Sequence, residues 1–137
     1  MKNFIYVFGI LGFLIVGCGT QQTTTSNEDK EEPVRIANDS LEYEITIIDP
    51  GFTSYLISAK PESYYSLSTL ESKNRVYVME WNSRFRSPTR YNSNIYENEI
   101  DYQPNIDYGM EVNYKLYQYF QFAQKKYNMR LSSFRID

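Results

Sequence analysis

Cys18 is the only cysteine in this chain of 137 residues, which limits how the chain can fold. No disulfide can form within the chain, so the folded part must be held together by its own hydrophobic core. The segment 39–137 is long enough for this, because a domain of its length buries roughly 60% or more of the surface that the unfolded chain exposes. Thirteen of the fourteen tyrosines lie in this segment, so aromatic rings must supply much of the core volume.

The residues before Cys18 predict export and attachment to a membrane. Lys2 is the only charged residue among the first twenty-seven, and it precedes an apolar stretch, 4–16, that is too short to cross a bilayer. This pattern predicts a signal peptide over 1–17. Ile15-Val16-Gly17-Cys18 resembles the lipobox of bacterial lipoproteins, which implies that Cys18 becomes the first mature residue and carries lipid such as palmitate. The alternative is an ordinary secreted protein in which this cysteine occurs by chance.

The residues after Cys18 indicate a linker and a location. Gly19 stands where many inner-membrane lipoproteins carry aspartate, which favours the outer membrane of the cell envelope. The chain from Gly19 to Asn38 is polar, charged and nearly free of large apolar side chains, so 18–38 is predicted to be a lipidated cysteine with a disordered linker. Twenty flexible residues have a root-mean-square reach of about 25 Å. We therefore expect partners close to the membrane and a single globular domain over 39–137.

Hydrophobic periodicity predicts an α+β fold for 39–137, with a two- or three-stranded sheet packed against about three helices. Apolar and polar residues alternate over 41–48, which predicts a strand with one buried face, and over 95–102, which predicts a second, edge strand. Helical spacing predicts helices over 52–60, 69–86 and 108–127. Leu131, Phe134 and Ile136 predict a short last strand that pairs with 41–48 and covers its edge.

The two longer helices carry end signals. Ser68-Thr69-Leu70-Glu71 matches a capping box and predicts the start of the helix over 69–86. Asn128 can adopt the left-handed conformation that ends the helix over 108–127. The apolar residues of this last helix point in too many directions for one stripe. We therefore expect it to be central in the core or to present aromatic rings to a partner.

The chain lacks residues on which many catalytic sites depend. It has no histidine, which excludes Ser-His-Asp and Cys-His systems and His-ligated metal sites. Beyond Gly19 only Gly51 and Gly109 remain, too few for a glycine-rich phosphate loop, and no Ser-x-x-Lys sequence occurs. The net charge over 39–137 is close to zero, which gives no electrostatic footprint for nucleic acid. We therefore predict no catalytic residues, metal, cofactor or nucleic-acid partner.

A group of carboxylates could nevertheless form a metal-binding or catalytic site. Glu97, Glu99 and Asp101 share one face of the strand predicted over 95–102, and two further acids, Asp107 and Glu111, follow closely. Such a group could bind a hard cation or provide the carboxylate pair of a glycosidase. The alternative is that the first three form a solvated strand face and the last two stabilise the positive end of a helix. A carboxylate-dependent hydrolase is therefore the most distant functional alternative.

Tyrosines and arginines offer a candidate binding surface. Tyrosine rings with solvated hydroxyls suit protein interfaces and stacking on sugars. Six of them lie at predicted helix ends and in loops, namely Tyr64, Tyr65, Tyr91, Tyr96, Tyr102 and Tyr108. The alternative is that these rings are core and rim of a small domain. Arg84, Arg86 and Arg90 predict either a local basic patch or solvated salt bridges with partners such as Glu80.

Three stretches carry a resemblance to a known family, namely Leu41–Phe52, Tyr64–Asn82 and Ile100–Tyr114. Together they resemble an uncharacterised family of small Bacteroidetes lipoproteins, a domain of unknown function. The resemblance implies a cell-envelope location and brings no activity or site residues. We therefore expect a lipid-anchored envelope protein, not an enzyme, that acts by binding as an accessory or scaffold component of a membrane-proximal assembly. The first alternative is a carbohydrate or peptidoglycan binding module.

Overall fold

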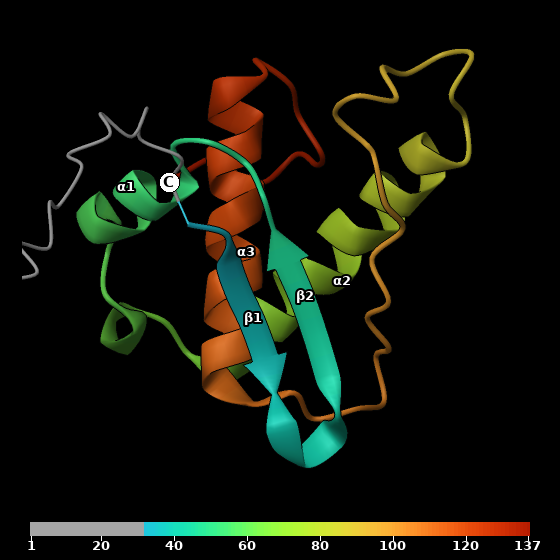
Figure 1. Ribbon diagram of the computed structural model, residues 1–137. Helices are drawn as coiled ribbons and strands as arrows, with labels where there is room; N and C mark the ends of the chain where they lie inside the picture. The colour runs from blue at the N-terminus through green and yellow to red at the C-terminus, as the bar shows by residue number, and fades with distance from the viewer. Residues whose placement is uncertain (1–31) are drawn as a thin grey trace, which may run out of the picture.

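The computed structural model describes residues 32–137, which form a small sheet and three helices. The sheet consists of β1 (Val34–Asn38) and β2 (Tyr43–Ile47), joined by the 3-10 helix η1 (Asp39–Leu41). There follow α1 (Phe52–Ser58), the 3-10 helix η2 (Glu62–Tyr64), α2 (Leu67–Phe85) and α3 (Gly109–Lys126). Figure 1 shows the sheet in front of α3, with α1 and α2 on either side. The α+β prediction is confirmed, whereas the predictions for 1–31, Cys18 included, lie outside the described residues.

β1 and β2 pair antiparallel, with Val34 opposite Ile47 and Asn38 opposite Tyr43. β2 confirms the strand predicted over 41–48. β1 lies within 18–38, so the prediction of a disordered linker is wrong from Val34 onward. The cause is the shortness of the pattern, because Val34 and Ile36 are the only two large apolar residues of this strand and directly follow an acidic run. Ile36 is nonetheless fully buried, and β1 packs against α3.

α3 runs through the centre of the molecule, as its many apolar directions predicted. All nine residues from Leu116 to Gln124 are buried, and the helix contacts α1, α2 and β1. Asn128 takes the predicted left-handed conformation just beyond the helix, with a φ of 47°. α2 begins two residues earlier than predicted, since Ser66 accepts the capping hydrogen bond from the N–H of Thr69.

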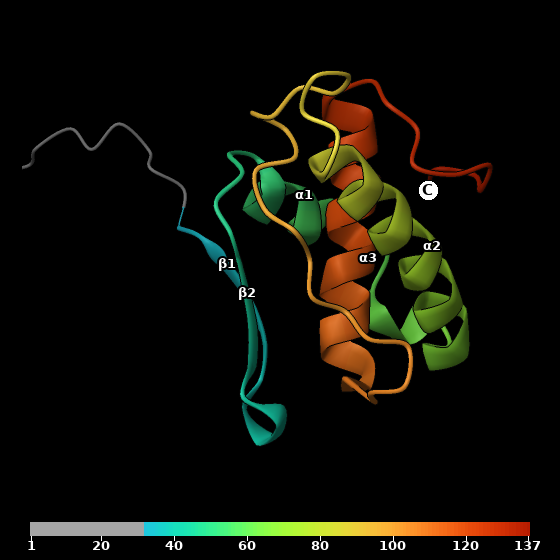
Figure 2. The same ribbon diagram turned by 90° about the vertical axis from the view of Figure 1, so that its right-hand side faces the viewer.

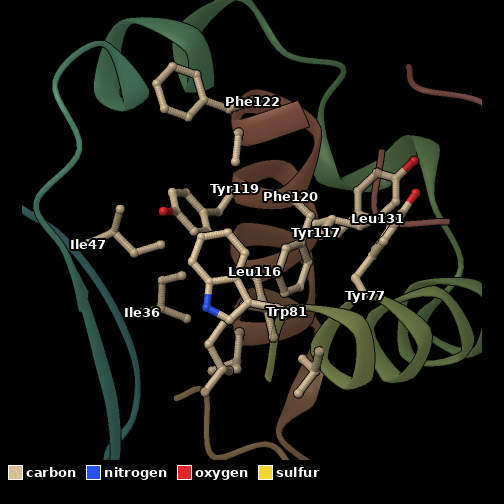
Figure 3. Close-up of a cluster of buried hydrophobic side chains, with 14 of the residues drawn as sticks. Ile36, Ile47, Tyr77, Trp81, Leu116, Tyr117, Tyr119, Phe120, Phe122 and Leu131 are labelled. Atoms are coloured by element: carbon tan, nitrogen blue, oxygen red, sulfur yellow. The ribbon is translucent and has the colours of Figure 1, made fainter. Parts of the chain in front are cut away.

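The core is built largely from aromatic rings. Tyr77 and Trp81 of α2 pack against Phe120 of α3, with ring centroids 5.3 and 6.1 Å apart. Figure 3 shows Trp81 between Ile36 and Ile47 of the sheet on one side and Phe120 on the other. A single tryptophan therefore joins the sheet to the two long helices.

Residues 128–137 bend back beside the helices without forming the predicted last strand, so that prediction is wrong (Figure 2). Their backbone is bonded to buried glutamines of α3. Gln124 Oε1 accepts from the N–H of Leu131 at 2.9 Å, and Gln121 Oε1 accepts from the N–H of Asp137 at 3.0 Å. Because the backbone of this segment is bonded to side chains of α3, it does not pair with β2. β2 therefore pairs with β1 alone among the described residues.

The side chain of Asp137 also holds the segment 128–137 against the rest of the domain. The carboxylate accepts hydrogen bonds from the hydroxyls of Tyr117 at 2.7 Å and Tyr65 at 3.2 Å. Burial disfavours the charged form, but the two hydroxyls and the charges of Lys60 and Lys73 outweigh burial and lower the pKa of Asp137. A group with a lowered pKa stabilises the fold above its unfolded-state pKa, and this contribution is lost as the pH falls through the folded-state value.

Replacing Asp137 with asparagine should therefore lower the free energy of unfolding by about 1–2 kcal/mol at pH 7, because two hydrogen bonds to a charged acceptor are weakened. Urea unfolding of the variant and of the unmodified chain measures this difference. The difference should shrink below the unfolded-state pKa of about 3.9, where the carboxylate becomes protonated. A difference of the same size at pH 7 and in acid would contradict the proposed role of the charge.

Candidate functional site

A pocket of about 290 Å³ opens between β2 and the segment 94–100. Its apolar lining consists of Ile45, Ile48 and Ile95, which are accessible, and of Ile47, Trp81 and Leu116, which are buried behind them in the core. Residues 45–50 form one wall, and Tyr119, Lys126 and Tyr127 of the α3 region complete the lining. Figure 2 looks toward the edge of β2 and shows the chain that leads to α3 running past the sheet. Four parts of the sequence that are far apart therefore meet at this pocket.

The segment 95–102 lines the pocket but is not the strand predicted for it, and that prediction is wrong. Side chains of α2 bind its backbone instead. The amide of Asn82 donates to the carbonyl of Ile100 at 2.8 Å and accepts from its N–H at 2.9 Å. Trp81 Nε1 donates to the carbonyl of Asn98 at 3.0 Å. Asn82 thus takes the place of a neighbouring strand, and the space between the segment and β2 stays open.

Asp49 lines the pocket and is fully engaged with its neighbours. Lys126 Nζ donates to the Asp49 carboxylate and to the carbonyl of Pro50, and the hydroxyl of Tyr127 donates to the same carboxylate at 2.9 Å. Burial, followed by the bond to Asp49, raises the pKa of Tyr127 to about 12, so this hydroxyl keeps its proton at neutral pH. The Asp49 carboxylate is therefore compensated, and it ties the turn before α1 to the end of α3.

Glu97 borders the same pocket without such compensation. Its side chain is exposed and makes no hydrogen bond or ion pair with any residue in 32–137. Its charge acts on the pocket interior, because the pKa of Tyr119 is raised first by burial and then by the negative charges of Asp49 and Glu97. The pocket thus combines accessible isoleucine side chains with an uncompensated negative charge. This combination favours a ligand with an apolar body and a cationic group.

The six tyrosines predicted as a binding surface lie in three separate pairs. The pairs are Tyr64–Tyr65, Tyr91–Tyr96 and Tyr102–Tyr108, with ring centroids 5.2, 6.0 and 4.9 Å apart. Tyr96 and Tyr108 are core residues with 5% and 3% of their surface exposed, whereas Tyr64 is 65% exposed. The rings follow the core-and-rim alternative and do not assemble into one aromatic patch.

A family model matches residues 5–136, which include every helix and strand described above. The chain belongs to DUF6146, a family of unknown function. No curated protein and no solved structure matches it. Within residues 32–137 of this DUF6146 protein, no helix is both long and apolar enough to span a bilayer.

The carboxylates predicted as a possible reactive group are dispersed in the DUF6146 fold. Three of them are bonded to neighbours: Glu99 to Arg86, Asp107 to the N–H of Gly109, and Glu111 to Lys115. Glu97 borders the pocket, whereas Glu99 and Asp101 border a second hollow next to Asn82. In the described part of the chain, no three Asp, Glu, His or Cys side chains are grouped so that they could hold a metal ion.

The arginines are also engaged. Arg84 pairs with Glu80 at 2.7 Å and donates to the hydroxyl of Tyr96 at 2.8 Å, and Arg86 pairs with Glu99. The alternative of solvated salt bridges is therefore confirmed for Arg86, whereas the side chain of Arg84, which also forms a salt bridge, is only 13% exposed. Arg90 lies over the ring of Tyr91, with 5.5 Å between the guanidinium carbon and the ring centroid.

Sequence reasoning missed two residues that shape the pocket, Asn82 and Asp49. Asparagine is disfavoured inside a helix because its side chain competes for backbone groups, and Asn82 directly follows the only tryptophan on the buried stripe. That unfavourable residue was the available signal. Asp49 is a single acid before Pro50 and Gly51, and nothing in this local sequence indicates its bonds to Lys126 and Tyr127, which lie 77 and 78 residues later.

Proposed function

We propose that this DUF6146 protein is held at the cell envelope by lipid on Cys18 and acts by binding a partner, as an accessory or scaffold component of a membrane-proximal assembly. The anchor is supported by Ile15–Cys18, which follows a short apolar segment. Acyl chains contribute about 0.8 kcal/mol per buried CH₂, so two or three chains give lasting attachment. Gly19 supports the outer membrane as the location.

The observation that carries the binding role is the open pocket beside β2. It combines accessible isoleucine side chains, the unpaired carboxylate of Glu97 and a strand that has a single neighbour among the described residues. Ligand sites in proteins typically join apolar walls to a few polar groups in this way. A catalytic role has less support, because the Asp49 carboxylate is bonded to Lys126 and Tyr127 and the chain has no histidine.

A glycan or peptidoglycan is the second candidate ligand, and it is favoured by Asn94 and Asn98 at the pocket. Stacking on a sugar ring would require an aromatic face that the ligand can reach. Trp81 and Tyr119, which line the pocket, are only 3% and 9% exposed, and the partly exposed ring of Tyr127 is covered by Lys126, whose Nζ lies 5.4 Å from the ring centroid. A protein partner is therefore the better fit to this site.

Replacing Cys18 with serine should move the protein from the membrane fraction to the soluble fraction and abolish its labelling by a fatty-acid analogue, because the residue that would carry lipid is gone. Cell fractionation with immunoblotting and metabolic lipid labelling measures both effects. Replacing Ser26 with alanine is the matched control in the same polar stretch and should change neither. Retention of the Cys18→Ser variant in the membrane fraction would contradict the lipid anchor.

The binding role is tested by affinity purification of the tagged full chain from crosslinked envelopes. A defined envelope protein should be recovered with the unmodified chain and depleted with the Cys18→Ser variant. Binding to isolated peptidoglycan and to a glycan panel is measured in parallel. Retention on glycans with no recovered protein would replace the preferred function with the second candidate.

A further inference from the structure

We propose that the free edge of β2 accepts an extended, basic segment of a partner protein, which pairs with β2 as a third strand and places one side chain in the pocket. This proposal rests on the binding function above and specifies the chemistry of the partner. Strand addition of this kind uses backbone hydrogen bonds for affinity and side-chain pockets for specificity.

The pocket borders the edge of β2 and not only one face. Side chains of successive strand residues point to opposite faces of a sheet. Ile45, Thr46 and Ile47 nevertheless all line the pocket, together with Ile48 just beyond the strand. Such a continuous run places the backbone edge of β2 at the pocket. Pairing with β1 satisfies one side of the strand, and no other described strand takes the opposite side.

The neighbouring segment 95–102 does not compete for this edge. The polar backbone groups of Ile100 are both bonded to Asn82, and the carbonyl of Asn98 is bonded to Trp81. The segment is therefore fixed to α2, with the pocket between it and β2. An unpaired strand edge beside a pocket is a ready template for an added strand.

The acidic residues near the edge of β2 favour a partner segment that carries positive charge. Glu97 at the pocket and Asp101 farther along the same segment make no hydrogen bond or ion pair with any residue in 32–137. Asp101 borders the second hollow, and its charge adds to the effect of burial in raising the pKa of Tyr43 on β2. The nearby cations are engaged, since Lys126 is bonded to Asp49. The edge is thus acidic and suits lysine or arginine.

The same charges disfavour a second copy of this chain as the occupant. Two β2 edges paired with each other would bring their unpaired acids together, and like charges across a strand pair are destabilising. A partner with alternating basic and aliphatic residues avoids this repulsion and supplies apolar groups that can pack on Ile45, Ile48 and Ile95, which line the pocket and are accessible.

The test is the binding of synthetic peptides to the full chain purified in mild detergent, measured by fluorescence anisotropy. The first peptide has about six residues, the usual strand length, and alternates lysine with valine. The second replaces each lysine with glutamate. The third is the lysine peptide with alternate backbone amides N-methylated, which prevents strand pairing. The lysine peptide should bind at least about tenfold more tightly than either of the others.

Replacing Glu97 with glutamine should weaken binding of the lysine peptide by about tenfold, since one charge-assisted contact is lost. Glu62→Gln is the matched control, because Glu62 is an exposed acid on η2 outside the pocket, and it should leave affinity unchanged.

Equal binding of the glutamate or N-methylated peptide, no effect of Glu97→Gln, or no binding of the lysine peptide would each overturn the proposal. A dimer that forms through β2 would also overturn it. The proposed function fails separately, when Cys18→Ser stays in the membrane or when no envelope protein is recovered. Recovery of a partner by a chain that does not bind the lysine peptide would therefore overturn this inference alone.

Discussion

Replacing Trp81 with alanine is expected to destabilise the fold by about 3–5 kcal/mol, the usual cost of removing a large buried ring. The side chain is 3% exposed and packs on Tyr96, Tyr119 and Phe120, with ring centroids 4.9, 5.6 and 6.1 Å away. It also donates to the carbonyl of Asn98, which would lose its partner. Because total stability of a small domain is about 5–15 kcal/mol, this variant should be close to unfolding. Urea unfolding followed by circular dichroism measures the loss.

Two further variants separate the causes of this loss. Trp81→Phe keeps a ring but removes the N–H donor and part of the volume, so it should cost less than the alanine variant. Met79→Ala truncates a side chain on the same helix that is 68% exposed, and it should change stability by no more than about 0.5 kcal/mol. Similar stabilities for Trp81→Ala and Met79→Ala would show that the tryptophan does not join the sheet to the helices.

The second large effect is expected at Asn82. Replacing it with leucine leaves the N–H and the carbonyl of Ile100 without their partner, at a cost of about 2–3 kcal/mol. Ile100 is only 8% exposed, so water cannot readily replace these bonds. Urea unfolding gives the cost, and hydrogen exchange of the Ile100 amide should become much faster relative to amides in α3. Retained protection of that amide would contradict the role assigned to Asn82.

Asn98→Leu is the matched control for this variant. It makes the same chemical change within the segment that Asn82 holds, but the Asn98 side chain is exposed, and its backbone carbonyl, not its amide, is the group that is bonded to Trp81. The Asn98 variant should therefore stay within about 0.5 kcal/mol of the unmodified chain.

The helices could be predicted from the sequence because their patterns are long. Leu70, Tyr77, Val78 and Trp81 recur at helical spacing, and all four are buried in α2. Strands were harder, because a few alternating residues can arise without a sheet. Over 95–102 the alternation of apolar and acidic residues is real, but Asn82 satisfies the backbone that a second strand would have paired.

The candidate site could not be predicted, because it depends on how distant segments meet. The alternation in the sequence placed Glu97, Glu99 and Asp101 on one face, yet the irregular backbone puts Glu97 at the pocket and Asp101 at a second hollow. Tyr96 and Tyr108 looked like loop residues suited to a surface, but both are buried against other rings. The abundance of tyrosine in the sequence suggested a binding surface. Only the three-dimensional packing shows which of these residues a ligand can reach.

Whether β2 binds a partner at the envelope is tested most directly by site-specific photocrosslinking in living cells. A photoreactive amino acid is placed at Thr46, an exposed residue of β2 beside the pocket, and in a separate strain at Met79 on α2. We expect Thr46 to crosslink to a defined basic segment of an envelope protein, and Met79 to give no such product. Crosslinking of that partner from Met79 and not from Thr46 would contradict the assignment of β2 as the binding edge.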